Sequence, residues 1–159
     1  MAADLRELER LMIRAALEDL NTAFTHHLDH NEVDALLDLF VDDVFYTHGE
    51  RHSHGKAELE QVFRHRAAAG PRTSRHIYSG LKLDIESASR ARGTSVCMTF
   101  GQNGLPPLQP AIPTLVADFN DVYVHCDDGK WRFKERHIHR IFVDPQNTGP
   151  LGQTRTRTR

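Results

Sequence analysis

The sequence is poor in the features that mark secreted, membrane-spanning and nucleic-acid-binding proteins. Cys97 and Cys126 are its only cysteines, and both lie in strand-like segments, so we expect buried reduced thiols rather than a disulfide. No stretch approaches the roughly 20 apolar residues of a membrane span, and the charged start MAADLRELERLM does not fit a signal peptide. A net charge of −2 gives no general attraction to nucleic acid or to an anionic membrane. We therefore expect a cytoplasmic globular protein with neither as partner.

The spacing of apolar residues changes at Gly70-Pro71. Before this point it is helical, with a stripe formed by Leu8, Leu11, Met12, Ala15, Ala16, Leu20 and Phe24. After this point apolar and polar residues alternate, as is typical of strands. The expected elements are helices over 4–28, 32–40 (capped by Asn31 and ended by Asp42-Asp43) and 56–69, a short strand over 44–49, and long strands over 76–87, 93–101, 114–126 and 130–143.

This order of elements predicts an α+β fold. We expect a cone-shaped barrel in which three N-terminal helices pack on a curved mixed or antiparallel sheet, enclosing a cavity suited to an apolar ligand. Four of the seven prolines lie in 101–113, which is therefore expected to be a loop at the rim of the sheet. Residues 1–146 are expected to form a single domain, and 147–159, ending in TRTRTR, a disordered basic tail.

Histidine is abundant, and the last strand contains the segment FKERHIHRIF. His137 and His139 are two residues apart, so they share a strand face with Glu135. Two such histidines can bind a metal with a third ligand, but no convincing third ligand follows from the sequence. Alternation puts the pair in phase with Phe133 and out of phase with Arg136, unless a bulge near 134–135 changes that phase.

Four segments together resemble the nuclear transport factor 2-like superfamily, and within it the SnoaL-like branch of dehydratases and polyketide cyclases. They are LDHNEVDALLDLFVDDVFY, SHGKAELEQVF, TSRHIY and ADFNDVYVHCDDGKWRFKER. The resemblance covers residues 5–144 and implies cofactor-free chemistry on a small hydrophobic molecule. It also implies a homodimer or homotrimer that associates through the outer face of the sheet.

The resemblance implies roles for four residues. His76 matches the general acid–base of the dehydratases, Tyr46 matches a tyrosine that binds a substrate oxygen, and Arg136 matches a pocket arginine. Asp29 lies near a catalytic aspartate and is expected to orient His76. The alternatives are a structural histidine at a helix–sheet junction and an aspartate in a turn.

Several positions depart from the family pattern or line the same surface. The tyrosine that those enzymes place on the first helix is replaced by Phe24 or is absent. His26 lies near the position of their catalytic aspartate, and Thr99 or Gly101 replaces a second acid–base residue. The expected substrate-binding residues are His26, His48, Tyr78, Thr99, His139 and Phe24.

The sequence therefore predicts a cofactor-independent lyase without a metal. Its substrate would be a hydrophobic, aromatic or polycyclic oxygenated molecule, and the reaction a proton abstraction with loss of water or of a small carbonyl fragment. A polyketide cyclase or isomerase using the same base is one alternative. A non-catalytic ligand-binding or scaffold domain is another, because one fold can host many functions.

Overall fold

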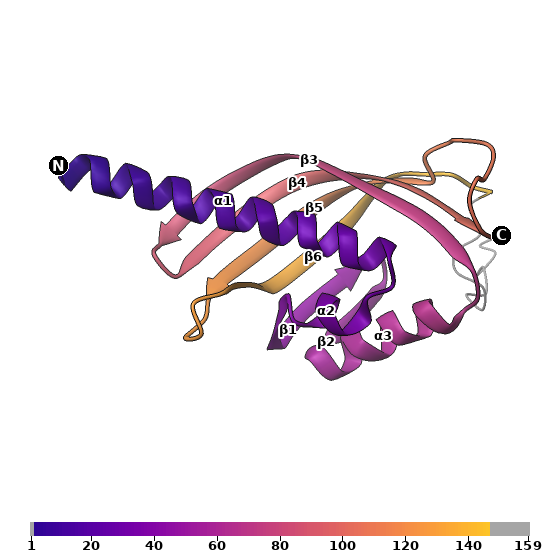
Figure 1. Cartoon of the computed structure of the whole chain (residues 1–159), viewed down its shortest axis with the longest axis horizontal. Helices are drawn as coiled ribbons and strands as arrows, with labels where there is room; N and C mark the ends of the chain where they lie inside the picture. Colours follow the sequence, from indigo (N-terminus) through magenta and orange to yellow (C-terminus); the bar gives the residue numbers. More distant parts are fainter. Residues whose placement is uncertain (1, 147–159) are drawn as a thin grey trace.

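The computed structural model describes residues 2–146; the expected tail at 147–159 lies outside this range. The helices are α1 (Ala2–Asp29), α2 (Val33–Leu37) and α3 (Lys56–Ala68). The strands are β1 (Phe40–His48), β2 (Arg51–His54), β3 (Arg72–Ser87), β4 (Arg90–Asn103), β5 (Leu115–His125) and β6 (Trp131–Val143). Figure 1 shows α1 running along one side of the long strands, with α2 and α3 grouped near its C-terminal end.

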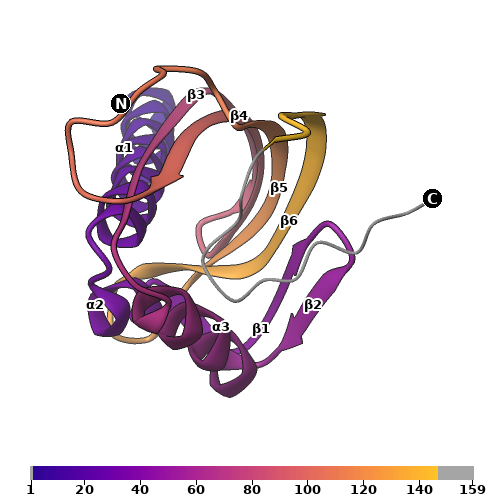
Figure 2. The same cartoon turned by 90° about the vertical axis from the view of Figure 1, so that its right-hand side faces the viewer.

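The strands form one six-stranded sheet in the order β2-β1-β6-β5-β4-β3. β1 and β6 are parallel, and the other neighbouring strands are antiparallel. Figure 2 shows that the sheet is strongly curved and that the helices lie on its concave side. The predicted α+β fold with a mixed sheet is confirmed, although the sheet remains open between its edge strands β2 and β3.

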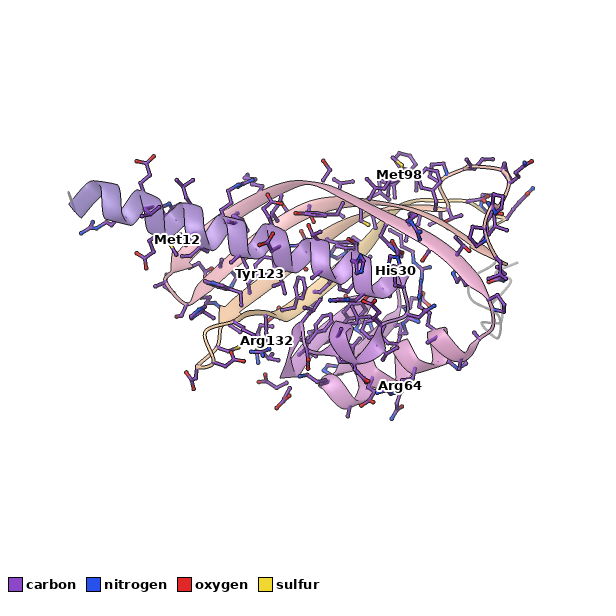
Figure 3. The ribbon with its side chains drawn as sticks, viewed as in Figure 1. Met12, His30, Arg64, Met98, Tyr123 and Arg132 are labelled. Atoms are coloured by element: carbon purple, nitrogen blue, oxygen red, sulfur yellow. The ribbon has the colours of Figure 1, made fainter. Side chains whose placement is uncertain are left out.

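The buried face of α1 differs from the predicted stripe. Leu17 and Phe24 are fully buried on the face that packs on the sheet, whereas Met12 is 66% exposed. The N-terminal part of α1 extends past the strands, where Met12 is labelled in Figure 3, so its apolar residues have no sheet to cover. The predicted stripe is wrong at Leu8, Leu11 and Met12 for this reason.

The segment between α1 and α3 also differs from the prediction. α2 ends at Leu37, and β1 begins at Phe40 and continues through Asp42-Asp43, which were expected to end a helix. Phe40 and Val44 are both buried, and their side chains tie this strand to the core. Asn31 does not cap α2: it has a positive φ of 54°, and Glu32 precedes the helix. Strand β2 was missed because its sequence RHSH has no apolar residue.

A bulge in β6 decides which way its side chains point. Tyr123 pairs with Phe133 but Val122 pairs with Glu135, so β6 contains one extra residue at this position. The bulge brings Phe133 and Arg136 onto the same buried face, and both are completely inaccessible to solvent. His139 lies on the other face and is exposed. Simple alternation, which put the histidine pair in phase with Phe133, does not hold across the bulge.

The expectations about membrane spans and cysteines can be compared with the described part of the chain. Within residues 2–146, no helix has the length and apolar character needed to cross a membrane. Cys97 and Cys126 are both free thiols, as expected; Cys97 is buried, but Cys126 is partly exposed, so its predicted burial is wrong. Burial raises the pKa of the Cys97 thiol to about 11.

Candidate active site

Asp29 and His76 form a hydrogen-bonded pair where the end of α1 meets β3. Nδ1 of His76 lies 2.6 Å from Oδ1 of Asp29, and the backbone N–H of His76 donates to Oδ2 at 2.9 Å. Ser74 lies two residues earlier on the same face of β3, and its hydroxyl donates to Oδ1 at 2.7 Å. Both oxygens of the carboxylate are therefore occupied: one binds the His76 ring, and the other binds the His76 backbone.

Arg66 of α3 contacts residues next to this pair by hydrogen bonds. Its Nη2 donates to the hydroxyl of Ser74 at 3.0 Å, and its Nη1 donates to the carbonyl of Leu28 at 2.9 Å and to Asn31 Oδ1 at 2.8 Å. These bonds cap the C-terminal end of α1, where backbone carbonyls lack helical partners. One cation thus holds the helix end that positions Asp29.

The Asp29 carboxylate is ionised and is oriented to accept a hydrogen bond from a ring nitrogen that carries a hydrogen. Burial alone would raise the pKa of Asp29, but the hydrogen bond and charge of His76 outweigh it and hold this pKa below its ordinary value. A carboxylate at Nδ1 favours the tautomer in which Nδ1 bears the hydrogen. Nε2 is then left with a free lone pair, and no residue in the described range 2–146 hydrogen-bonds to it.

The strand beside His76 presents small polar groups. Thr99 of β4 pairs directly with His76 and is 7% exposed. Gly101 pairs with Ser74. Thr99 carries a hydroxyl and Gly101 has no side chain, so His76 is the one titratable group at this cross-strand pair.

Arg136 lies at the centre of a buried polar network. Its Nε donates to Asp121 Oδ1 at 2.8 Å and its Nη2 donates to Asp121 Oδ2 at 2.7 Å, a bidentate pair in which both side chains are fully buried. Nη2 also donates to Asn21 Oδ1 at 2.5 Å. Tyr123, labelled between α1 and the sheet in Figure 3, joins the network by donating to Asp121 Oδ2 at 2.8 Å.

Aromatic rings surround the same guanidinium. Its Cζ lies 4.0 Å from the ring centroid of Phe133, 4.3 Å from that of Phe24 and 4.6 Å from that of Phe119. Burial alone would lower the pKa of Arg136, but Asp121 outweighs it and raises the pKa, so the residue remains a cation. Its Nη1 is buried and has no hydrogen-bond partner among the described residues.

Tyr46 and His48 of β1 lie beside this network. Tyr46 pairs with Arg136 across the parallel strands, is 4% exposed, and has its pKa raised by burial, so it keeps its proton. Burial lowers the pKa of His48 to about 3, and the positive charges of Arg140, Arg51 and His76 act in the same direction. His48 is therefore a neutral imidazole whose buried Nε2 has no partner in the described structure.

The remaining predicted residues lie in different places. Phe24 is completely buried under Arg136, and its role is to pack against that cation. The hydroxyl of Tyr78 donates to Glu18, so it is already occupied; burial and this carboxylate raise its pKa to about 12. His139 is exposed on the outer face of the sheet, and His26 is 56% exposed at the end of α1. The structure does not place these two histidines beside His76.

The sequence interpretation missed several supporting residues. Ser74 carries a detectable signal, because it lies two positions before His76 and so shares its strand face. Asn21 is a polar residue four positions after Leu17 on the buried face of α1, and such residues usually need a buried partner. Nothing local marks Arg66, which reaches Ser74 only through the packing of α3.

Together, His76, Arg136 and His48 have the properties of an acid–base catalytic site. One oriented imidazole with a free nitrogen can move a proton, while the unpartnered groups of Arg136 and His48 can bind an oxygen atom of a ligand. An α+β fold with a carboxylate-oriented histidine between its helices and its curved sheet is the arrangement that the sequence resemblance led us to expect.

Comparisons with known proteins identify the family. The chain belongs to the SnoaL-like domain family, whose model matches residues 9–137. It is similar to the crystal structure of a putative scytalone dehydratase from Novosphingobium aromaticivorans, with 22% identity, coverage of 92% of this chain and 98% of that chain, and a TM-score of 0.77. None of the curated proteins compared matches the chain.

Other solved structures share the fold. The type 2 hexachlorocyclohexane dehydrochlorinase LinA is 20% identical, covers 92% of this chain and 99% of its own, and has a TM-score of 0.73. ActVI-ORFA from Streptomyces coelicolor is 18% identical, covers 80% of this chain and 96% of its own, and has a TM-score of 0.70. At these identities the likeness establishes the fold, and the chemistry must be argued from the site.

Proposed function

We propose that this chain is a cofactor-independent lyase acting on a hydrophobic, oxygenated ring compound. The observation that carries the proposal is the His76–Asp29 pair, in which Nδ1 is bound to the carboxylate and Nε2 is free. The same carboxylate also accepts hydrogen bonds from the backbone of His76 and from Ser74, which Arg66 contacts in turn, so residues of α1, α3 and β3 together position His76. A putative scytalone dehydratase and a dehydrochlorinase among the structural relatives support an elimination.

The proposed reaction is the loss of water from a β-hydroxy ketone. Nε2 of His76 takes the proton from the carbon next to the carbonyl, and the C–H electrons form the new double bond. The bond to the hydroxyl group on the next carbon breaks, and that oxygen leaves with the proton returned from the imidazolium. The products are an unsaturated ketone and water, and His76 ends in its starting state. Asp29 stabilises the imidazolium in between.

The carbonyl oxygen of the substrate gains negative charge during this step. Tyr46 keeps its proton and can donate a hydrogen bond to it, and the free Nη1 of Arg136 supplies a second donor from the neighbouring strand. Both groups are buried, where a hydrogen bond to a developing oxyanion is stronger than in water. The same constellation also suits a retro-aldol cleavage, in which a small carbonyl fragment leaves instead of water.

A turnover assay separates this proposal from its alternatives. The probe is a panel of bicyclic β-hydroxy ketones, of which a fused hydroxytetralone is the simplest, because loss of water extends the conjugated system and changes the ultraviolet spectrum. Catalysed loss of water supports a lyase. Conversion to an isomer or a new ring without loss of water indicates a cyclase or isomerase. Saturable binding of the panel without any conversion indicates a binding domain and contradicts the proposal.

We also propose that the chain forms a homodimer or homotrimer through the outer face of its sheet. Ile77 of β3 and Met98 of β4 are cross-strand neighbours on this face, with 55% and 38% of their surface exposed. Phe142 of β6 is 70% exposed. In Figure 3 Met98 points away from the helices. Exposed apolar side chains grouped on one face are typical of a surface that associates with another protein.

A further inference from the structure

Three side chains that can bind a metal converge at the C-terminal end of α1. His26 and His27 lie in the last turn of the helix, and Glu32 lies just before α2. One donor atom from each lies within 4.8 Å of the other two, and this is the one such group of three or more among residues 2–146. Nδ1 of His27 is 2.5 Å and Nε2 of His26 is 3.8 Å from Oε2 of Glu32.

The backbone holds these side chains together. The N–H of Glu32 donates to the carbonyl of His27 at 3.0 Å, which folds the chain back after α1. Asn31 has a φ of 54° and makes the reversal possible. The arrangement therefore rests on fixed backbone bonds, and the donor atoms are set close together before any ligand arrives.

The ring of a neighbouring histidine packs against the ring of His26. The ring of His30 stacks on it with 4.3 Å between centroids, and Nδ1 of His30 donates to the carbonyl of His26 at 2.7 Å. Figure 3 labels His30 at this end of α1. A ring that is held in place by its neighbours loses less freedom when it binds an ion.

We propose that His26, His27 and Glu32 bind a divalent transition metal of the zinc class. Two imidazole nitrogens and one carboxylate are a donor set that zinc accepts in a tetrahedral site, with a water in the fourth position. Magnesium and calcium prefer oxygen donors and fit this set poorly. The side chains are 56%, 25% and 46% exposed for His26, His27 and Glu32, so an ion can enter from solvent.

The site is separate from the proposed chemistry but adjacent to it in sequence. Its ligands lie on both sides of Asp29, so a bound ion ties the last turn of α1 to the start of α2 across that residue. An ion that binds the folded chain and not the unfolded chain stabilises the fold by mass action. Zinc should therefore raise the melting temperature as well as bind.

The test is a calorimetric titration of the metal-stripped full chain with zinc chloride. The variants are His26→Ala and Glu32→Gln, and the control is His65→Ala, which removes an exposed histidine from α3. We expect one zinc ion per wild-type chain, an affinity lowered by at least about tenfold in the two site variants, and no change in the control. Circular dichroism confirms that each variant is folded.

Two results would overturn the proposal. One is the absence of saturable zinc binding to the wild-type chain. The other is binding whose affinity is the same in Glu32→Gln and in wild type, which would place the ion at other histidines. A rise in melting temperature on adding zinc to wild type, but not to Glu32→Gln, provides a second readout that does not depend on any enzymatic activity.

Discussion

Asp29 and His76 lie 47 positions apart in the chain, yet Oδ1 of the carboxylate is 2.6 Å from Nδ1 of the imidazole. The pair joins the last residue of α1 to the inner face of β3. It connects the helical layer to the sheet, and the proposed chemistry depends on it.

Replacing Asp29 with asparagine is expected to reduce kcat by roughly 10²- to 10⁴-fold, the usual contribution of general acid–base catalysis. The amide can offer its N–H to Nδ1, which favours the wrong tautomer and moves the hydrogen to Nε2. It also cannot stabilise the imidazolium. Steady-state kinetics on an active β-hydroxy ketone give kcat and KM separately. A variant with wild-type kcat would show that the carboxylate only holds the fold.

The same carboxylate should contribute to stability in acid. The pKa of Asp29 lies below its ordinary value of 3.8 in the folded chain, so the unfolded chain binds the proton more readily. This contribution is present above pH 3.8 and is lost as the pH falls through the folded-state value. The measurement is the free energy of unfolding of wild type and Asp29→Asn from pH 6 down to the acid limit.

We expect the stability difference between the two proteins to shrink as the pH falls through this range. A difference that stays constant would mean that Asp29 titrates alike in both states, contrary to its hydrogen bonds with His76 and Ser74.

The pair of Asp121 and Arg136 is expected to stabilise the core. Asp121→Asn leaves a buried guanidinium without its counter-charge, and breaking a buried pair in this way costs about 3–5 kcal/mol of unfolding free energy. Urea denaturation provides the measurement. The control is Asp128→Asn, which removes an exposed carboxylate from its pair with Arg132. Equal effects of the two substitutions would contradict a structural role for the buried pair.

The outer face of the sheet is expected to hold the copies of the chain together. Ile77→Asp places a charge among exposed apolar side chains and should shift the protein to monomers in light scattering coupled to size exclusion. Leu105→Asp is the matched control, since Leu105 is 74% exposed but lies in the loop after β4. A wild-type protein that is monomeric at high concentration, or a Leu105→Asp variant that dissociates as Ile77→Asp does, would contradict this interface.

The sequence predicted the long elements of the fold well. The four long strands were recognised because alternation persists over many residues. The prediction from sequence failed where the secondary structure of a short segment is decided by its packing against the rest of the molecule. Phe40 looks like the end of a helix, but its burial against the core makes it the first residue of β1.

The sequence predicted several individual residues of the candidate site, but not how the fold brings them together. His76, Asp29, Tyr46 and Arg136 were selected mainly through the family resemblance, because no local pattern joins them. The bulge at 134–135 could be named as a condition but not deduced, since it becomes necessary only when Arg136 must meet Asp121 across the strands. His26 was assigned to the site because it lies near a family position, and His139 because of strand alternation. Their actual positions depend on how α1 ends and on the bulge in β6.

The central claim is that His76 carries the proton. The most direct measurement is the turnover of an active β-hydroxy ketone by His76→Ala, with circular dichroism and melting temperature as checks on folding and His65→Ala as the matched control. The account predicts that His76→Ala is folded and has lost its turnover, while His65→Ala retains it. Near-wild-type turnover by folded His76→Ala would contradict the account.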